Sequence, residues 1–216
     1  MRRVIVLGAN GKVGRILINK LKDSSRFHPV AVVRKEQQIK SFEDQGIDTK
    51  LLSLEDTVEK ISQVLEGNDA VVFTAGSGGS TGDDKTLAID LDGAVKAMEA
   101  AENTGVKRFV MVSAIHADDR SKWNDSGIPG YYIAKHYADR ILKDSDLDFT
   151  ILRPGLLLDD KGSGTITTED PESQKGVPRE DVANLIVEVL DHNNTIGKTV
   201  TFNQGSTPVR EVARNL

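Results

Sequence analysis

Short runs of apolar residues recur along the chain, separated by longer stretches whose apolar residues have helical spacing. Several runs are continuous in Val, Ile and Leu, which is typical of strands covered on both faces. The runs predict strands at Arg3–Leu7, Val30–Val33, Lys50–Leu52, Ala70–Ala75, Arg108–Ser113, Asp148–Leu152 and Thr199–Phe202. The stretches between them predict helices at Val13–Lys22, Glu55–Leu65, Lys85–Asn103, Tyr132–Lys143 and Arg179–Leu190.

Strands and helices that alternate in this way predict a parallel sheet with helices on both faces. We therefore expect an α/β fold, with a single Rossmann-type, doubly wound domain over residues 1–216. Two stretches, Gly76–Asp84 and Arg153–Pro178, predict irregular structure. Both follow strands and are expected at the carboxyl edge of the sheet, where open α/β sheets bind ligands. The second stretch is the expected substrate-side loop.

Composition narrows the class of protein. The chain has 216 residues, no cysteine and four scattered histidines, so we expect neither a disulfide nor a metal site. A net charge of -5 without a basic run argues against a nucleic-acid partner. No apolar stretch reaches the length of a membrane span, and the N-terminus leads directly into a strand. The expectation is a cytoplasmic enzyme or binding protein with a small-molecule substrate, either monomeric or homodimeric.

The first predicted strand runs into a glycine-rich turn with the spacing G-x-x-G-x-x-G. Glycines at these positions let the backbone turn sharply and approach a pyrophosphate, and the helix that follows presents free N–H groups to it. Because the turn joins a strand to a helix in an α/β pattern, it predicts a dinucleotide site. The expected contacts are Gly8, Asn10, Gly11, Lys12, Val13 and Gly14.

The end of the second predicted strand bears on the choice of dinucleotide. A fold that prefers NAD carries an acidic residue there to bind the ribose 2′-hydroxyl. This chain has Arg34 and Lys35 instead, and a guanidinium suits a 2′-phosphate. The sequence thus favours NADP(H) over NAD(H), with Lys12 as an additional phosphate contact. The alternative is that Arg34 and Lys35 simply begin a solvated helix.

A Y-x-x-x-K spacing, Tyr131 to Lys135, follows the fifth predicted strand, which ends at Ser113. Residues i and i+4 share a helix face, so both side chains can point at one ligand. A phenol with a pKa near 10 exchanges protons poorly at neutral pH until a nearby cation favours its phenolate, which Lys135 is expected to do. Ser113 would hold a substrate carbonyl. The alternative is a tyrosine cluster at the core edge with a solvated lysine.

Seven motifs together resemble the atypical, NAD(P)H-binding branch of the short-chain dehydrogenase/reductase superfamily, related to epimerase/dehydratase proteins. They are Gly8–Gly14, Asp69–Gly76, Asp90–Ala94, Phe109–Ser113, Tyr131–Lys135, Arg153–Gly155 and Arg179–Ala183. The resemblance implies a Rossmann fold with Tyr131 as acid/base, Lys135 on the nicotinamide ribose and Ser113 on the substrate. It also implies cofactor contacts from Ala75, Gly76, Pro154 and Gly155.

The chain departs from the family pattern at two positions. Asp90 stands where extended relatives carry the Asn of a catalytic tetrad, and Ser53 replaces an Asp near the adenine. An ionised Asp accepts hydrogen bonds but cannot donate them, so its role differs from that of Asn. The candidate catalytic residues are Tyr131, Lys135, Ser113 and Asp90.

Two functions remain open. The first is an NADP(H)-dependent oxidoreductase or epimerase-like enzyme acting on a small carbonyl or alcohol. The second is a non-catalytic NADP(H)-binding redox sensor or regulatory protein, which the Asp90 departure favours.

Other polar residues fit structural roles better. The pairs Asp118–Asp119 and Asp159–Asp160 are expected in solvated turns, and Arg179–Asp181 at a helix N-terminus. His116 lies just beyond Ser113, and Trp123 is expected either to close over a substrate or to plug its loop onto the domain.

Overall fold

The centre of the computed structural model is a nine-stranded sheet, and its strand order is β11-β8-β10-β6-β5-β4-β1-β2-β3. The structure describes residues 1–78, 81–173 and 176–216. The strands are β1 (Arg2–Leu7), β2 (Phe27–Val33), β3 (Asp48–Leu51), β4 (Ala70–Phe73), β5 (Arg108–Val112), β6 (Asp148–Pro154), β7 (Leu157–Leu158), β8 (Thr165–Thr167), β9 (Val177–Pro178), β10 (Lys198–Gln204) and β11 (Thr207–Pro208). All pairings are parallel except those of β8 with β10 and β11.

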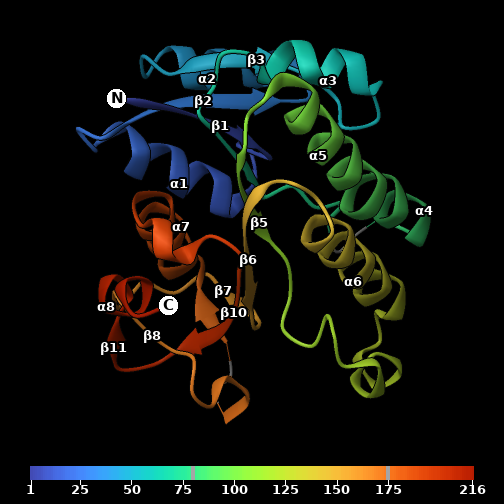
Figure 1. Ribbon diagram of the computed structural model, residues 1–216, viewed down its shortest axis with the longest axis vertical. Helices are drawn as coiled ribbons and strands as arrows, with labels where there is room; N and C mark the ends of the chain where they lie inside the picture. Colours follow the sequence, from blue (N-terminus) through green and yellow to red (C-terminus); the bar gives the residue numbers. More distant parts are fainter. Residues whose placement is uncertain (79–80, 174–175) are drawn as a thin grey trace.

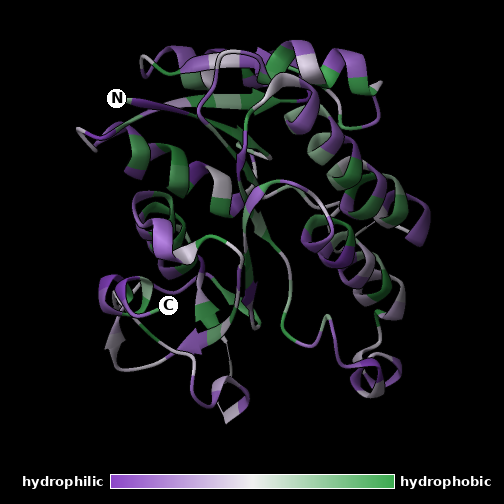
Figure 2. Cartoon of the chain, viewed as in Figure 1, coloured by the Kyte–Doolittle hydropathy of each residue, from purple (hydrophilic) through white to green (hydrophobic). Residues whose placement is uncertain are grey.

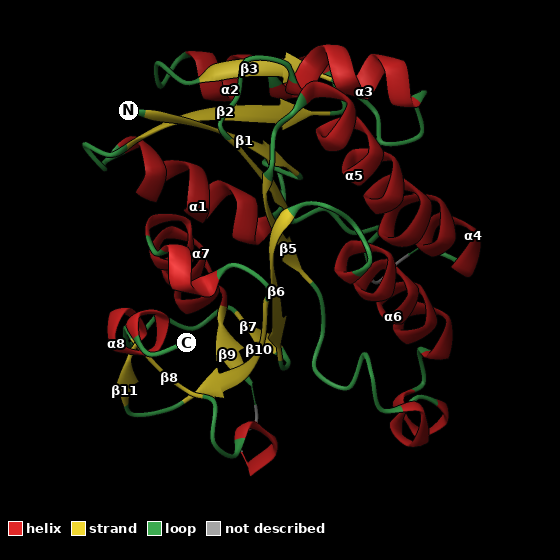
Figure 3. Cartoon of the chain, viewed as in Figure 1, coloured by secondary structure: helices red, strands yellow, loops and turns green. Residues whose placement is uncertain are grey.

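Helices cover both faces of this sheet (Figure 1, Figure 3). They are α1 (Lys12–Lys22), α2 (Lys40–Glu43), α3 (Val58–Leu65), α4 (Asp83–Lys85), α5 (Gly93–Thr104), α6 (Pro129–Lys143), α7 (Arg179–Asp191) and α8 (Val209–Arg214), with a π-helical segment η2 (Thr86–Asp92) between α4 and α5. One core contains α1, α7 and α8, and the other contains α3, α5 and α6. None of the described helices is both long and apolar enough to cross a bilayer.

The continuous apolar strands are explained by these two cores. In β1, Val4 and Val6 pack into the core under α1 and α7, whereas Ile5 and Leu7 pack into the core under α3 and α5. Successive strand side chains point to opposite faces, so a strand covered on both sides needs an apolar residue at every position. The helices differ from these strands. In Figure 2 they carry both hydrophobic and hydrophilic residues, because only one face of each helix is buried.

All seven predicted strands are present, with ends that differ by up to three residues. The continuous helix expected at Lys85–Asn103 is wrong. The π-helical segment η2 interrupts it, and α5 then ends at Thr104, before Gly105. Residues 153–178 were expected to be irregular, but they hold the end of β6, the short strands β7 to β9 and a one-turn 3-10 helix. Strands of two or three residues are too short for an alternation to be visible. Of Gly76–Asp84, positions 79–80 lie outside the described residues, and α4 begins at Asp83.

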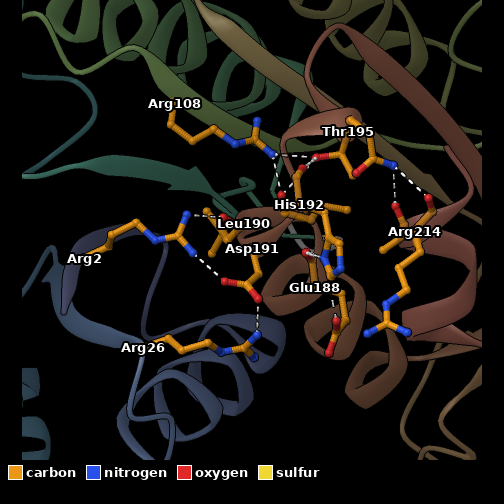
Figure 4. A network of polar contacts seen from close by, with 12 residues as sticks. Arg2, Arg26, Arg108, Glu188, Leu190, Asp191, His192, Thr195 and Arg214 are labelled. Carbon is orange, nitrogen blue, oxygen red and sulfur yellow. Dashed lines mark hydrogen bonds and ion pairs between the residues drawn. The ribbon is translucent and has the colours of Figure 1, made fainter.

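The amino edge of the sheet is tied to the end of α7 by arginines (Figure 4). Arg2 donates to the carbonyl of Leu190 at 2.6 Å and to the carboxylate of Asp191 at 2.7 Å. Arg108 donates to the carbonyl of Val189 at 2.8 Å and to the Thr195 hydroxyl at 3.1 Å. The last carbonyls of a helix have no partner within the helix, and these cations supply one while matching the negative end of its dipole.

Candidate active site

A cavity of about 270 Å³ opens at the carboxyl edge of the sheet, where the chain order reverses between β1 and β4. Open α/β sheets bind ligands at this switch point, because the loops that follow the two neighbouring strands diverge there. The glycine turn and the ends of β2, β3 and β4 form the wall. The predicted cofactor residues in the wall are Gly8, Asn10, Gly11, Arg34, Ala75 and Gly76.

The glycine turn fits a bound pyrophosphate. Gly8 has a φ of +92°, and a Cβ on it would lie 2.6 Å from the backbone nitrogen of Ala75. A Cβ on Gly14 would collide with the carbonyl of Gly8. Helix α1 begins at Lys12 without a capping hydrogen bond from a described side chain or an acid in its first turn. Its first N–H groups therefore have no side-chain partner among the described residues. They carry the positive end of the helix dipole next to Gly11, which lines the cavity, and this favours an anion there.

The predicted phosphate-binding cations differ in their surroundings. Arg34 lies in the cavity wall, and the Glu55 carboxylate in the same wall pairs with Lys85 at 2.7 Å. Lys35 is exposed and precedes a one-turn 3-10 helix, outside the residues that line the cavity. The outer position of Lys35 suits the alternative in which it simply begins a solvated helix.

Lys12 and Val13, at the start of α1, have other contacts. Lys12 forms an ion pair of 2.6 Å with Asp159, which also pairs with Arg179 at 2.6 Å. This bridge joins the glycine-turn helix to the segment after β6. Val13 is buried in the core, so only its backbone is available to a cofactor.

Helix α6 carries Tyr131, Lys135 and Asp139 on one face, at positions i, i+4 and i+8. The Lys135 ammonium lies 5.5 Å from the centroid of the Tyr131 ring. It is buried, pairs with Asp90 Oδ1 at 3.1 Å and donates to the carbonyl of Val112 at 3.4 Å. The structure thus brings Tyr131, Lys135 and Asp90 together beside the end of β5.

Asp90 reaches this cluster from the π-helical segment η2. Its Oδ2 accepts the backbone N–H of Ser77 at 2.9 Å, and its Oδ1 faces Lys135. Only 1% of its side chain is exposed. The buried carboxylate thus has one donor facing each of its oxygens. π-Helical turns occur often at functional sites, and here the segment carries the residue that departs from the family pattern.

The pKa of Tyr131 corrects one expectation. Lys135 does act to lower it, as predicted, but burial has the larger effect, and Asp90 adds to burial, so the pKa of Tyr131 is raised above its ordinary value. For Lys135 itself, burial acts to lower the pKa, but Tyr131 and Asp90 outweigh it, and the pKa is raised. The lysine is therefore charged and the tyrosine protonated at neutral pH.

Ser113 follows β5, and its backbone N–H donates to the carbonyl of Leu152 at 2.7 Å. Its buried hydroxyl lies close enough to the Asp139 carboxylate to act on the pKa of that acid. Asp139 is held by Arg153, whose Nε donates to its Oδ2 at 2.8 Å, and Arg153 also pairs with Asp118. Burial raises the pKa of Asp139 against the opposing effects of Arg153 and Ser113. This network places an ion pair directly behind Ser113.

Sequence reasoning missed Asp139 as part of the site. Asp118 lies in a solvated turn as expected, and from there it also pairs with Arg153. Extending the i, i+4 spacing from Lys135 by one turn would have reached Asp139. Pro154 and Gly155 end and follow β6 near the Ser113 loop, since the carbonyl of Pro154 accepts the N–H of Ile115 at 2.8 Å. The residues predicted for the nicotinamide end thus lie at one sheet edge.

The remaining polar residues mainly hold loops. Trp123 is buried, and its indole N–H donates to the carbonyl of His116 at 2.8 Å, so it plugs its loop onto the domain. His116 has a φ of +65°, a rare conformation for a side chain-bearing residue. Glu180 and Asp181 begin α7 as expected, and they accept backbone N–H groups from residues 162–164.

Comparisons with known proteins agree with this arrangement. A family model described as "NAD(P)H-binding" matches residues 8–193. The chain is 45% identical over 214 residues to "Uncharacterized sugar epimerase YhfK" of Bacillus subtilis (strain 168), covering 99% of this chain and 100% of that protein.

Two solved structures are similar over nearly the whole chain. The first, "Putative NAD-dependent epimerase/dehydratase from Bacillus halodurans", has a TM-score of 0.93 and 42% identity and covers 100% of both chains. The second, the oxidoreductase ylbE from Lactococcus lactis, has a TM-score of 0.89 and 32% identity and covers 99% of this chain and 96% of its own. The chain therefore belongs to the NAD(P)H-binding family, in the atypical branch of the short-chain dehydrogenase/reductases.

Proposed function

We propose that the protein is an NADP(H)-dependent oxidoreductase or epimerase-like enzyme that acts on a small carbonyl or alcohol, with Tyr131 as its acid/base. The observation that carries this proposal is the pairing of the half-buried Tyr131 with the buried Lys135, at the sheet edge where the glycine-turn cavity opens. A bound nicotinamide supplies or accepts hydride. The accompanying proton needs a positioned donor or acceptor, and Tyr131 is the group on this face suited to that exchange.

The remaining residues have supporting roles. The uncapped N-terminus of α1 and the glycine turn would hold the pyrophosphate. Arg34 would bind the 2′-phosphate, because the nearby Glu55 is already paired with Lys85. Ser113, whose hydroxyl lies at the end of β5 beside Asp139, would hold the substrate oxygen. Lys12 and Lys35 would add positive charge, and Pro154 and Gly155 would lie along the nicotinamide.

The test is a binding titration with NADPH, NADH and their oxidised forms, followed by a screen of carbonyl substrates. We expect NADPH to bind at least about tenfold more tightly than NADH, since the 2′-phosphate gains a charged partner. Arg34→Gln should remove that preference, whereas Lys50→Gln, a change to another exposed cation, should not. Equal affinities for NADPH and NADH in the unaltered protein would contradict the assigned cofactor.

A Tyr131→Phe variant tests the chemistry separately. Turnover should fall by about 10²- to 10⁴-fold while NADPH affinity stays within about twofold, because only the proton-exchanging hydroxyl is removed. Tyr137→Phe is the matched control on the same helix, since Tyr137 is partly exposed. Unchanged turnover in Tyr131→Phe would rule out the proposed role.

A redox sensor is the second candidate, favoured by Asp90 and by the bridge from Lys12 through Asp159 to Arg179, which links the cofactor helix to the segment after β6. A sensor must bind NADP⁺ and NADPH with different affinities, because only differential affinity shifts a conformational equilibrium. Equal affinities together with measurable turnover would eliminate it.

A further inference from the structure

Asp90 changes what Lys135 can do to Tyr131. The Lys135 ammonium is 3.1 Å from Asp90 Oδ1, and it is 5.5 Å from the centroid of the Tyr131 ring. A lone buried ammonium at that distance would strongly favour a phenolate. An ammonium already paired with a carboxylate acts on the phenol as a dipole, whose field is weaker and falls off faster with distance. The pair therefore gives the phenolate little support.

The other charged groups around Tyr131 do not restore that support. Asp83 of α4 lies against Gly130, the residue before Tyr131. Asp139, one turn beyond Lys135 on α6, acts to raise the pKa of Tyr131, as does the adjacent Tyr132. Arg153 of β6 is engaged by Asp139 and Asp118. Since burial raises the pKa of Tyr131 further, the hydroxyl keeps its proton.

We propose that Asp90, by pairing with Lys135, keeps the Tyr131 hydroxyl protonated at neutral pH, so that the resting site is ready to donate a proton to a carbonyl oxygen. Asp90 is then a positioning residue that acts on Tyr131 through Lys135. This inference rests on the proposed function and narrows it to a reductase of aldehydes or ketones. An epimerase that begins by oxidising an alcohol would need the phenolate from the start.

Reduction of a carbonyl at this site balances in bonds, electrons and protons. Hydride supplied by the reduced nicotinamide forms a C–H bond at the carbonyl carbon, and the π pair of the C=O bond moves to the oxygen. The Tyr131 O–H bond breaks as that oxygen takes the proton, which leaves a phenolate beside Lys135. A proton from solvent then restores the hydroxyl, so each turnover consumes one hydride and one proton.

The test is an absorbance titration of tyrosinate in the protein without cofactor. Subtracting the curve of Tyr131→Phe from that of the unaltered protein isolates Tyr131 from Tyr132 and Tyr137. The same subtraction is then made between Asp90→Asn and the Asp90→Asn, Tyr131→Phe double variant. We expect a Tyr131 midpoint above 10 in the unaltered protein and a midpoint lower by at least about one pH unit in Asp90→Asn. Equal midpoints in the two backgrounds would overturn the inference.

A second measurement uses initial rates of alcohol oxidation, recorded immediately after mixing to each pH. The rate stops rising with pH once Tyr131 is ionised, so the midpoint of this profile should fall by about one pH unit in Asp90→Asn. Asp90→Glu, which restores the charge, should return the midpoint toward that of the unaltered protein. An unchanged midpoint in Asp90→Asn would refute the role of Asp90. A protein that shows the titration shift but no turnover would instead refute the proposed function.

Discussion

The two edges of the sheet both hold charged side chains in place, but with different partners. At the amino edge, Arg2 and Arg108 donate to carbonyl oxygens at the end of α7 (Figure 4). At the carboxyl edge, Lys135 and Arg153 are paired with carboxylates, and the Ser113 hydroxyl faces Asp139.

The two kinds of partner separate residues that stabilise the scaffold from residues of the candidate site. Burial lowers the pKa of Arg108 to about 10, which still leaves it charged at neutral pH as a fixed part of the scaffold. The amino edge thus pairs its cations mainly with backbone carbonyls, and the carboxyl edge pairs them with buried carboxylates beside the cavity.

The largest effect is expected from breaking the buried pair at the carboxyl edge. Lys135→Met leaves the Asp90 carboxylate buried without its ammonium, which should lower the free energy of unfolding by about 3–5 kcal/mol. The double variant Asp90→Asn, Lys135→Met removes both charges and should recover at least half of that loss. Urea denaturation measures both. A loss below about 1 kcal/mol in the single variant would show that the pair is not a buried charge pair.

An intermediate effect is expected at the amino edge. Arg108→Met removes the hydrogen bonds that Arg108 donates to the carbonyls of Asp148 and Val189 and to the Thr195 hydroxyl, and it should lower the free energy of unfolding by about 1–3 kcal/mol. NADPH affinity should stay within about twofold, because this edge is remote from the cavity. Arg214→Met, at an exposed arginine, should change stability by less than about 0.5 kcal/mol. A large change in NADPH affinity for Arg108→Met would contradict the division between the edges.

The smallest effect is expected at the bridge beside the glycine turn. Asp159→Asn releases Lys12 and Arg179 for the cofactor phosphates, so NADPH should bind about two- to fivefold more tightly at low salt. The gain should disappear at high salt, because these charges are exposed. Asp160→Asn, at the neighbouring exposed carboxylate, is the control. Weaker NADPH binding in Asp159→Asn would mean that the bridge supports the site.

The same bridge has a defined pH dependence. Hydrogen bonding from Lys12 and the charge of Arg179 hold the pKa of Asp159 below 3.8. An acid whose pKa is lowered in the folded state contributes stability above its unfolded pKa and loses it as the pH falls through the folded value. The bridge should therefore persist through neutral and mildly acidic pH and open only below about pH 4. A difference in NADPH affinity between Asp159→Asn and the unaltered protein that vanished at pH 5 would contradict this.

The strands and helices whose apolar residues recur with a regular period could be predicted from the sequence. Strands such as β1 and helices such as α7 are long enough for their apolar pattern to be visible, and the glycine turn has a fixed spacing. The strands β7 and β9 have two residues each, and they exist because of partners that are distant in the chain, as when the N–H of Val177 donates to the carbonyl of Leu156. No local pattern carries that information.

The candidate site was predictable to the same extent. The Y-x-x-x-K spacing indicated a shared face for Tyr131 and Lys135, and the helix places them there. The direction of the Tyr131 shift was not predictable, because it is the net of burial, Lys135 and Asp90, and burial is a property of the whole fold. Asp139 was missed because its importance comes from Arg153, a residue on another element.

The π-helical segment η2 has an evolutionary consequence. A π-helical turn contains one residue more than an α-helical turn, so the segment corresponds to a single-residue insertion in the helix that ends at Thr104. Deleting one residue ahead of Asp90 would restore α-helical spacing and rotate the preceding residues by about 100° relative to α5. A change in chain length of one residue can therefore alter which groups reach Lys135 and Ser77 without any substitution at the site.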